Sequence, residues 1–257
     1  MPSTHKDLSS WADTPFPLIP TPCGSRSLAK EHGSRMMAHE MTQLHNCILH
    51  VLNCVYNQAP HVTSPKDIKD LLHLVKLWHD ELEHHHQTEE QCFFPAIERL
   101  SGEKGVMEGN IDQHHRFEPG LEALKKYALE TRIEEYNAGD LRAIIDNFGD
   151  ILQTHLNDEI DTLLDLKHYD SGELKACWAE THNYVLKTCD SRVQLPMLLG
   201  SMDRTYEGKA QGLSMPWFLY YLVEFWFSRE HKDSWRFLPC TTWGKPKPLW
   251  ATGAVKS

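Results

Sequence analysis

The chain has 257 residues, enough for one well-buried core plus an extension, and its 24% charged and 40% apolar residues are typical of a globular rather than a disordered protein. A formal net charge of −10, from 26 basic and 36 acidic side chains, disfavours nucleic acid and anionic membranes as partners. Histidine is the compositional outlier: 14 of the 17 histidines lie between His32 and His168, a bias that favours a metal site.

Residues 1–33 are predicted to form an extended N-terminal arm. Four prolines and Gly24 stand among polar residues and leave this stretch without a core of its own; the prolines are Pro15, Pro17, Pro20 and Pro22. We expect Trp11 and Phe16 to pin the arm to the body of the protein.

Residues 34–168 are predicted to form a domain of four helices. The first ends near Gln58, before Pro60. Ser64 and Pro65 begin the second as cap and first helical residue, and it runs to about residue 100. The third begins near residue 106, and the fourth begins at Asp140 as its cap. Four helices of similar length joined by short loops predict an all-α fold, an antiparallel up-down four-helix bundle.

The apolar stripe of each predicted helix contains polar residues. In the second helix the apolar residues recur at intervals of four, three and four, and His85 and Glu89 continue the count. A spacing of four places both side chains on one helix face, about one turn apart. Buried polar groups are costly unless something binds them, and a metal ion is the simplest partner. The candidate ligands from the four helices are His45, His85, Glu89, His114, Glu118, His155 and Glu159.

Two assignments stay open at this level. Glu118 is either a ligand or a partner that orients a histidine ligand. A phase error of one residue would exchange His114 for His115. We expect His84, His86 and His115 to point about a quarter turn or more away from the site, in solvated or orienting roles.

The ligand set itself indicates the kind of metal. Four imidazoles with three carboxylates suit a pair of borderline ions bridged by a carboxylate, with iron as the leading candidate. Open coordination positions would then admit dioxygen or peroxide.

The motifs that carry these residues resemble those of the hemerythrin-like, or HHE cation-binding, family. They are His45-Asn46, His85-x-x-x-Glu89-Glu90 followed by Phe-Phe-Pro, Gln113-His114-His115 and His155-x-x-x-Glu159, within about residues 35–168. The resemblance implies a non-haem di-iron centre, with dioxygen as its ligand, held by His45, His85, Glu89, His114, His155 and Glu159. It also implies that Glu89 and Glu159 bridge the two irons.

Two departures from invertebrate hemerythrins stand out. This chain has Glu118 where those proteins have a second histidine in the third helix, and Glu159 in place of a later aspartate. The site therefore resembles di-iron oxidases and iron sensors more than a pure oxygen carrier.

Residues 169–257 are predicted to form a C-terminal extension packed on the bundle. A short helix is expected over residues 173–187, followed by an aromatic and proline-rich segment similar to that of fungal members of the family. The apolar run 215–227 contains Glu224 and is too short to span a bilayer, so we expect a cap or lid.

The seven cysteines are scattered without metal-binding spacing, and no signal-peptide pattern is present. These features predict a reducing, cytoplasmic location.

The sequence therefore predicts a hemerythrin-like oxidoreductase that uses a di-iron centre to bind or activate dioxygen. A small apolar substrate would lie under the aromatic lid, and fungal secondary metabolism is the expected context. The alternatives are a non-catalytic module that stores or senses iron or oxygen, and a structural bundle with vestigial histidines.

Overall fold

The computed structural model describes residues 11–22, 28–208, 213 and 215–256. Over these residues the protein is helical and contains no β-strand, which confirms the all-α prediction. No helix in this part of the chain is long and apolar enough to cross a membrane.

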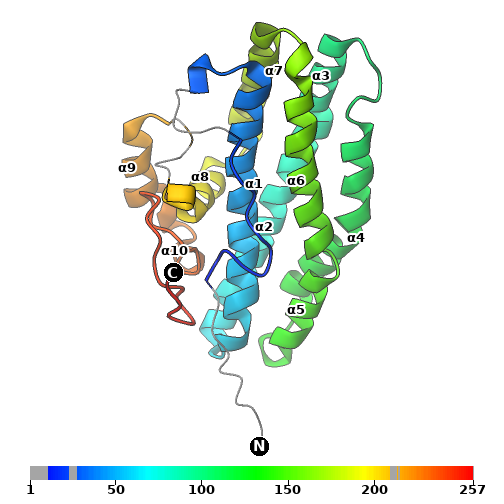
Figure 1. Cartoon of the computed structure of the whole chain (residues 1–257). Helices are drawn as coiled ribbons and strands as arrows, with labels where there is room; N and C mark the ends of the chain where they lie inside the picture. Colours follow the sequence, from blue (N-terminus) through cyan, green and yellow to red (C-terminus); the bar gives the residue numbers. More distant parts are fainter. Residues whose placement is uncertain (1–10, 23–27, 209–212, 214, 257) are drawn as a thin grey trace, which may run out of the picture.

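An antiparallel helical bundle forms the centre of the molecule (Figure 1). Its helices are α1 (Gly33–Gln58), α2 (Pro65–Thr88), α4 (Glu108–Glu130) and α6 (Gly149–Asp165), the last preceded by α5 (Ala138–Asp146). Helix α1 packs against α2 and α6, and α4 packs against the other face of the same pair. All four long helices therefore border one interior.

Two of the predicted helices are not continuous. A π-helical turn (Glu89–Phe93) separates α2 from α3 (Phe94–Ser101), and the fourth helix is divided between α5 and α6 at Asn147 and Phe148. The prediction of Asp140 as a cap is wrong. The Asn137 side chain caps α5 instead, accepting hydrogen bonds from the backbone N–H of Gly139 at 2.8 Å and of Asp140 at 3.3 Å.

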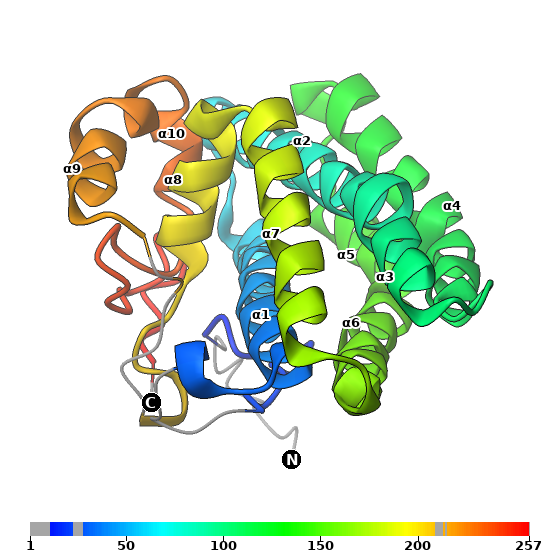
Figure 2. The ribbon, with the colours of Figure 1, turned by 90° about the horizontal axis from the view of Figure 1, so that it is seen from above.

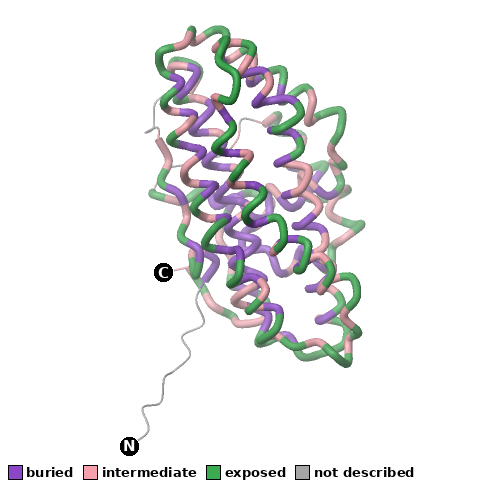
Figure 3. The backbone as a smooth tube through the Cα atoms, turned by 90° about the vertical axis from the view of Figure 1, so that its right-hand side faces the viewer, coloured by how far each residue is buried: buried purple, intermediate pink, exposed green. Residues whose placement is uncertain are grey.

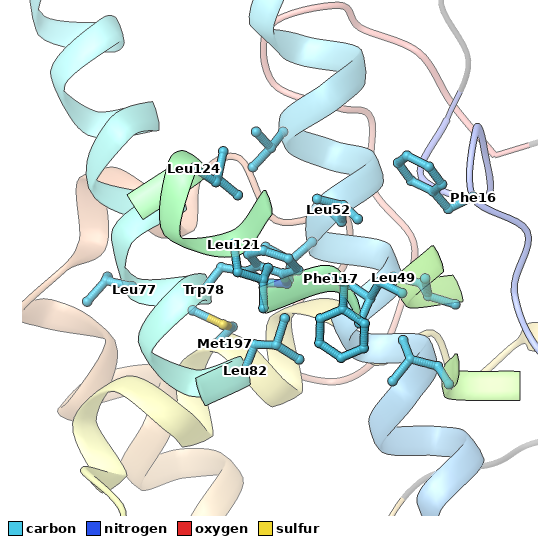
Figure 4. Close-up of a cluster of buried hydrophobic side chains, with 14 of the residues drawn as sticks. Phe16, Leu49, Leu52, Leu77, Trp78, Leu82, Phe117, Leu121, Leu124 and Met197 are labelled. Carbon is cyan, nitrogen blue, oxygen red and sulfur yellow. The ribbon is translucent and has the colours of Figure 1, made fainter. Parts of the chain in front are cut away.

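Close packing fills the interior between the helices (Figure 4). Leu52, Leu82 and Phe117 are each 1% exposed or less and come from three different helices. Truncating one such side chain to alanine costs about 2–5 kcal/mol, so this core, which exists only when the helices meet, carries much of the stability. Figure 3 shows the same division, with buried residues along the inner helix faces.

The described part of the N-terminal arm lies along α1. Asn46 and Asn53 each hold it by paired backbone hydrogen bonds, Asn46 to Ile19 at 2.7 and 2.9 Å and Asn53 to Phe16 at 2.9 Å each. Trp11 and Phe16 are buried as expected. A methyl group at Gly149 would overlap the Phe16 ring, so a glycine is needed where the arm crosses the start of α6. Residues 1–10 and 23–27 of the predicted arm, Gly24 among them, lie outside the described residues.

The C-terminal extension covers one side of the bundle (Figure 2). Helix α7 (Ser171–Thr188), which matches the predicted short helix, packs against α1 and α3. Helix α8 (Ser191–Ser201) packs against α1 and α2. Helix α9 (Trp217–Phe225) packs on α8, and a turn (Phe227–Arg229) and α10 (Lys232–Trp235) follow it.

The apolar run that was expected as a cap or lid forms α9, which packs on α8 and on the turn that follows it. Helix α8 separates α9 from the bundle, and α9 lies at the opposite side of the molecule from α4 (Figure 2). Trp217, Phe225 and Trp226 are 75%, 59% and 66% exposed. The sequence pattern identified an apolar helix but could not show which neighbour it would pack against.

The burial of Glu81 in the contact between α2 and α8 predicts that the stability of the protein depends on pH. Burial, together with the charges of Asp190 and Asp80, raises the pKa of Glu81 to about 7. A folded-state pKa above the unfolded value means that the native state gains protons, so stability is lost as pH rises from about 4.5 through 7. We expect Glu81→Gln to raise the free energy of unfolding by roughly 1–3 kcal/mol at pH 8 and to change it little at pH 4. Urea unfolding at both pH values measures this, with the exposed Glu130→Gln as control; an equal effect at both pH values would contradict it.

Candidate metal centre

The bundle brings six of the seven predicted ligands together. They come from α1, α2, the π turn, α4 and α6 and are His45, His85, Glu89, His114, His155 and Glu159. Five of the six side chains are at least nine-tenths buried, and that of His85 is 17% exposed. Buried groups of this kind, converging from four helices, are how bundles build metal sites.

One group of ligands lies on the α4 side of the interior. His86, Glu89, His114 and His155 each offer an atom within 4.8 Å of the others. The Nε2 atoms of His114 and His155 are 3.1 Å apart, and Oε2 of Glu89 is 3.6 Å from Nε2 of His114. Three imidazoles and one carboxylate are a complete donor set for a divalent transition metal.

A second group lies on the α1 side and shares Glu89 with the first. Oε1 of Glu89 is 3.0 Å from Nε2 of His85, which is 3.3 Å from Nε2 of His45. Oε2 of Glu159 lies 3.3 Å from the same His45 atom. Glu89 therefore turns one oxygen toward each group, the arrangement of a carboxylate that can bridge two ions.

Several buried polar atoms of the cluster have no hydrogen-bond partner in the described part of the chain, which is what is expected of atoms that bind a cation. Both carboxylate oxygens of Glu89 and of Glu159, and Nε2 of His86, are buried without a hydrogen-bond partner among the described residues. Burying a carboxylate in this way costs several kcal/mol unless a cation compensates it. Metal ions would supply that compensation to all of these atoms at once.

Proton affinities in the cluster also favour metal binding. Burial lowers the pKa of His155 to about 3 and that of His86 well below its usual value, so both rings are neutral near pH 7 and keep a free lone pair. Burial, with the charge of Glu159, raises the pKa of Glu89 well above its usual value. Metal ions bind the deprotonated carboxylate, so a proton and a metal ion would compete for Glu89.

Three histidines are held in a fixed orientation by hydrogen bonds at Nδ1, the ring nitrogen that faces away from the cluster. Nδ1 of His45 donates to the Leu156 carbonyl at 2.7 Å, since a carbonyl can only accept. Nδ1 of His155 lies 3.1 Å from the Gln113 side-chain oxygen, and Nδ1 of His114 lies 2.6 Å from Oε1 of Glu90. Each bond places the proton on Nδ1 and leaves Nε2 bare toward the cluster, which is the tautomer that a metal requires.

The π turn sets the position of two of these carboxylates. Consecutive residues Glu89 and Glu90 both reach His114, Glu89 at its Nε2 and Glu90 at its Nδ1. A π turn adds one residue to a helical turn and is frequently found at functional sites. The interruption of α2 therefore falls at the centre of the cluster.

The structure places two residues, His86 and Glu118, differently from the sequence-based expectation. His86 was expected to point away, yet its ring is 4.3 Å from that of His114, measured between centroids. Helix α2 has neighbours on two sides, so His85 faces His45 and the next residue, turned by about 100°, faces α4. Glu118 is exposed on α4, outside the cluster. His115 is exposed as expected, and of the two neighbouring histidines it is His114 that lies in the cluster. If the prediction had allowed α2 to bury more than one narrow face, it would have placed His86 inside the bundle as well.

The hydrogen bond between Glu90 and His114 leads to a prediction about metal affinity. We expect Glu90→Gln to weaken metal affinity by about 10–100-fold, because His114 would lose the negatively charged acceptor that raises the basicity of its ring. Competition with a chelator of known affinity measures the change. The exposed Glu103→Gln removes the same charge nearby and should leave affinity unchanged; equal behaviour of the two variants would disprove the orienting role of Glu90.

A helical bundle with a buried cluster of histidines and carboxylates defines this chain as a cation-binding bundle protein. The family model described as the hemerythrin HHE cation binding domain matches residues 36–166, about half of the chain. The chain belongs to this hemerythrin-like family.

A curated relative is similar over almost the whole length. The dimeric xanthone biosynthesis cluster protein R11 of Cryptosporiopsis sp. (strain 8999) is 36% identical over 241 residues, which cover 93% of this chain and 92% of the relative. The similarity therefore includes the C-terminal extension as well as the bundle. No solved structure matches the chain significantly.

Proposed function

We propose that the cluster holds two iron ions, bridged by Glu89, and that the protein uses them to bind or activate dioxygen. The observation that carries this proposal is the shared position of Glu89, which presents one oxygen 3.0 Å from His85 and the other 3.6 Å from His114. Glu159 is the second carboxylate available to the pair, 3.3 Å from His45. Mixed imidazole and carboxylate donors favour iron over metals that prefer thiolate or all-oxygen sites.

The protein would act as an oxidoreductase in secondary metabolism. Two irons in this cluster would supply redox chemistry toward dioxygen. The surrounding residues would hold the imidazoles in the metal-binding tautomer and exclude bulk water. The relative's name places that protein in a biosynthetic cluster, which supports a tailoring oxidation of a small apolar molecule.

Metal content tests the proposal directly. Protein purified without oxygen should carry about two irons per chain, and its visible absorption should change on exposure to oxygen. His114→Ala should lose iron and the spectral change, while His115→Ala, its exposed neighbour, should keep both. Another bound metal, or full iron content in His114→Ala, would overturn the assignment.

A second candidate is a non-catalytic module that stores or senses iron or oxygen. The complete burial of His45, His155 and Glu159, each 0% exposed, favours a ligand as small as dioxygen over an organic substrate. This function predicts reversible oxygen or iron binding without product. Product formed by iron-loaded protein from a supplied substrate and reductant, and lost in His114→Ala, would decide for the oxidoreductase.

A further inference from the structure

A surface groove of about 540 Å³ lies far from the metal cluster. Its walls are the first half of α2, the residues that end and follow α4, and the segment 229–234 of the C-terminal extension. At 1.5 Å per residue, Lys76 is about 14 Å along α2 from His85, so the two sites are separate. Sites for small molecules have roughly this volume.

The acidic residues of the groove are already neutralised. Asp70 pairs with Lys66 at 2.7 Å and with Arg236 at 2.8 Å. Asp233 pairs with Lys66 at 3.0 Å, and Glu230 pairs with Arg192 at 3.4 Å. Each of these carboxylates therefore already has a cationic partner.

Three of the basic residues, by contrast, are available. Lys76 pairs with Asp80 at 2.5 Å, but Lys69, Arg229 and Lys232 form no ion pair within 4.0 Å with a carboxylate of the described residues. The three converge on one groove from two separate segments. In a chain with a net charge of −10, this groove is therefore a locally positive site.

A pair of histidines adds a hydrogen-bond donor at the same place. Nε2 of His73 lies 3.0 Å from Nδ1 of His231, and both residues line the groove. When both rings are neutral, one donates to the other, and a single N–H remains on the outer nitrogen of one ring. An acidic ligand can accept from that N–H and from the three cations together.

Most of the remaining lining is apolar. Leu72, Leu129 and Ile133 contribute to the groove, and Leu129 is 59% exposed. An exposed leucine beside unpaired cations suits a ligand that has an apolar body and one acidic group.

We propose that this groove binds a small organic acid, a carboxylate carried on an apolar ring system. The carboxylate meets Lys69, Arg229, Lys232 and the histidine pair, and the ring covers Leu72, Leu129 and Ile133. The binding is independent of the metal cluster, so it does not depend on the proposed oxidoreductase activity.

Calorimetric titration of the full chain with 2-naphthoate tests this. The wild type binds it, and the double variant Lys69→Glu/Arg229→Glu binds it at least roughly tenfold more weakly because two charge-assisted contacts become repulsive. Lys104→Glu/Lys126→Glu, which changes the same charge on exposed positions outside the groove, binds like the wild type. Both variants should melt with the wild type, since the replaced side chains are exposed or half-buried.

Three results would overturn the proposal. They are no binding of 2-naphthoate, equal binding of the neutral analogue 2-naphthalenemethanol, and displacement of 2-naphthoate by inorganic phosphate at equal concentration. The first denies the site, the second denies the role of charge, and the third would show a site for bare anions.

Discussion

Glu89→Gln will remove most of the bound metal, because Glu89 is the one side chain common to both ligand groups. An amide cannot carry the negative charge that two cations share, and only one of its two terminal atoms is an acceptor. We expect the affinity to fall by more than roughly 100-fold, the upper end of the loss seen when only a residue behind a ligand is removed. Elemental analysis after gel filtration measures the metal retained per chain.

The matched control is Glu118→Gln. It makes the same chemical change in the same His-x-x-x-Glu spacing, but at an exposed position of α4. Metal content should stay at the wild-type value. In the presence of chelator Glu89→Gln should melt at least as high as the wild type, because glutamine avoids burying an unpaired charge. Equal metal loss in both glutamine variants would disprove the cluster described above.

Removing the metal from the wild type will lower its melting temperature by about 10 °C. A ligand present at about 1,000 times its dissociation constant stabilises the folded state by about 4 kcal/mol, and each kcal/mol shifts the melting temperature by roughly 2–4 °C for a chain of this size. The unpaired oxygens of Glu89 and Glu159 become uncompensated on metal loss and add to the effect. Differential scanning calorimetry with and without chelator gives the shift.

Glu89→Gln is the control for this experiment as well. Its melting temperature should change little on adding chelator, since it retains little metal to lose. If the melting temperature of the wild type does not change when chelator is added, the alternative of a structural bundle with vestigial histidines would be favoured. Restoration by added iron, but not by calcium, would indicate the imidazole-rich donor set.

Much of this fold could be predicted from local patterns. The cap at Ser64 with Pro65 behind it marks the start of α2, and the apolar periodicity that contains His45, His155 and Glu159 identifies their inward faces. These features depend on neighbours in sequence, through helix geometry and capping. For that reason several helix starts and ends and most of the cluster could be predicted without knowledge of packing.

The errors arose where packing between distant segments decided the outcome. His86 is inward because α2 has neighbours on both sides, and Glu118 is outward because α4 buries only a narrow face there. The π turn at Glu89 shifts the helical phase, which a regular period cannot express. The sequence could not show that the aromatic helix α9 packs on α8, because the hydrophobic effect has no direction and does not select a neighbour.

The sequence alone thus determined an all-α bundle and the chemical type of its site, because helix periodicity and donor chemistry are local properties. Only the tertiary structure decided that His86 joins one of the two groups of histidines that meet at Glu89. It also brought together the groove in which Lys69 meets Arg229 and Lys232. Both features join residues from separate segments, and their positions follow from how the helices pack.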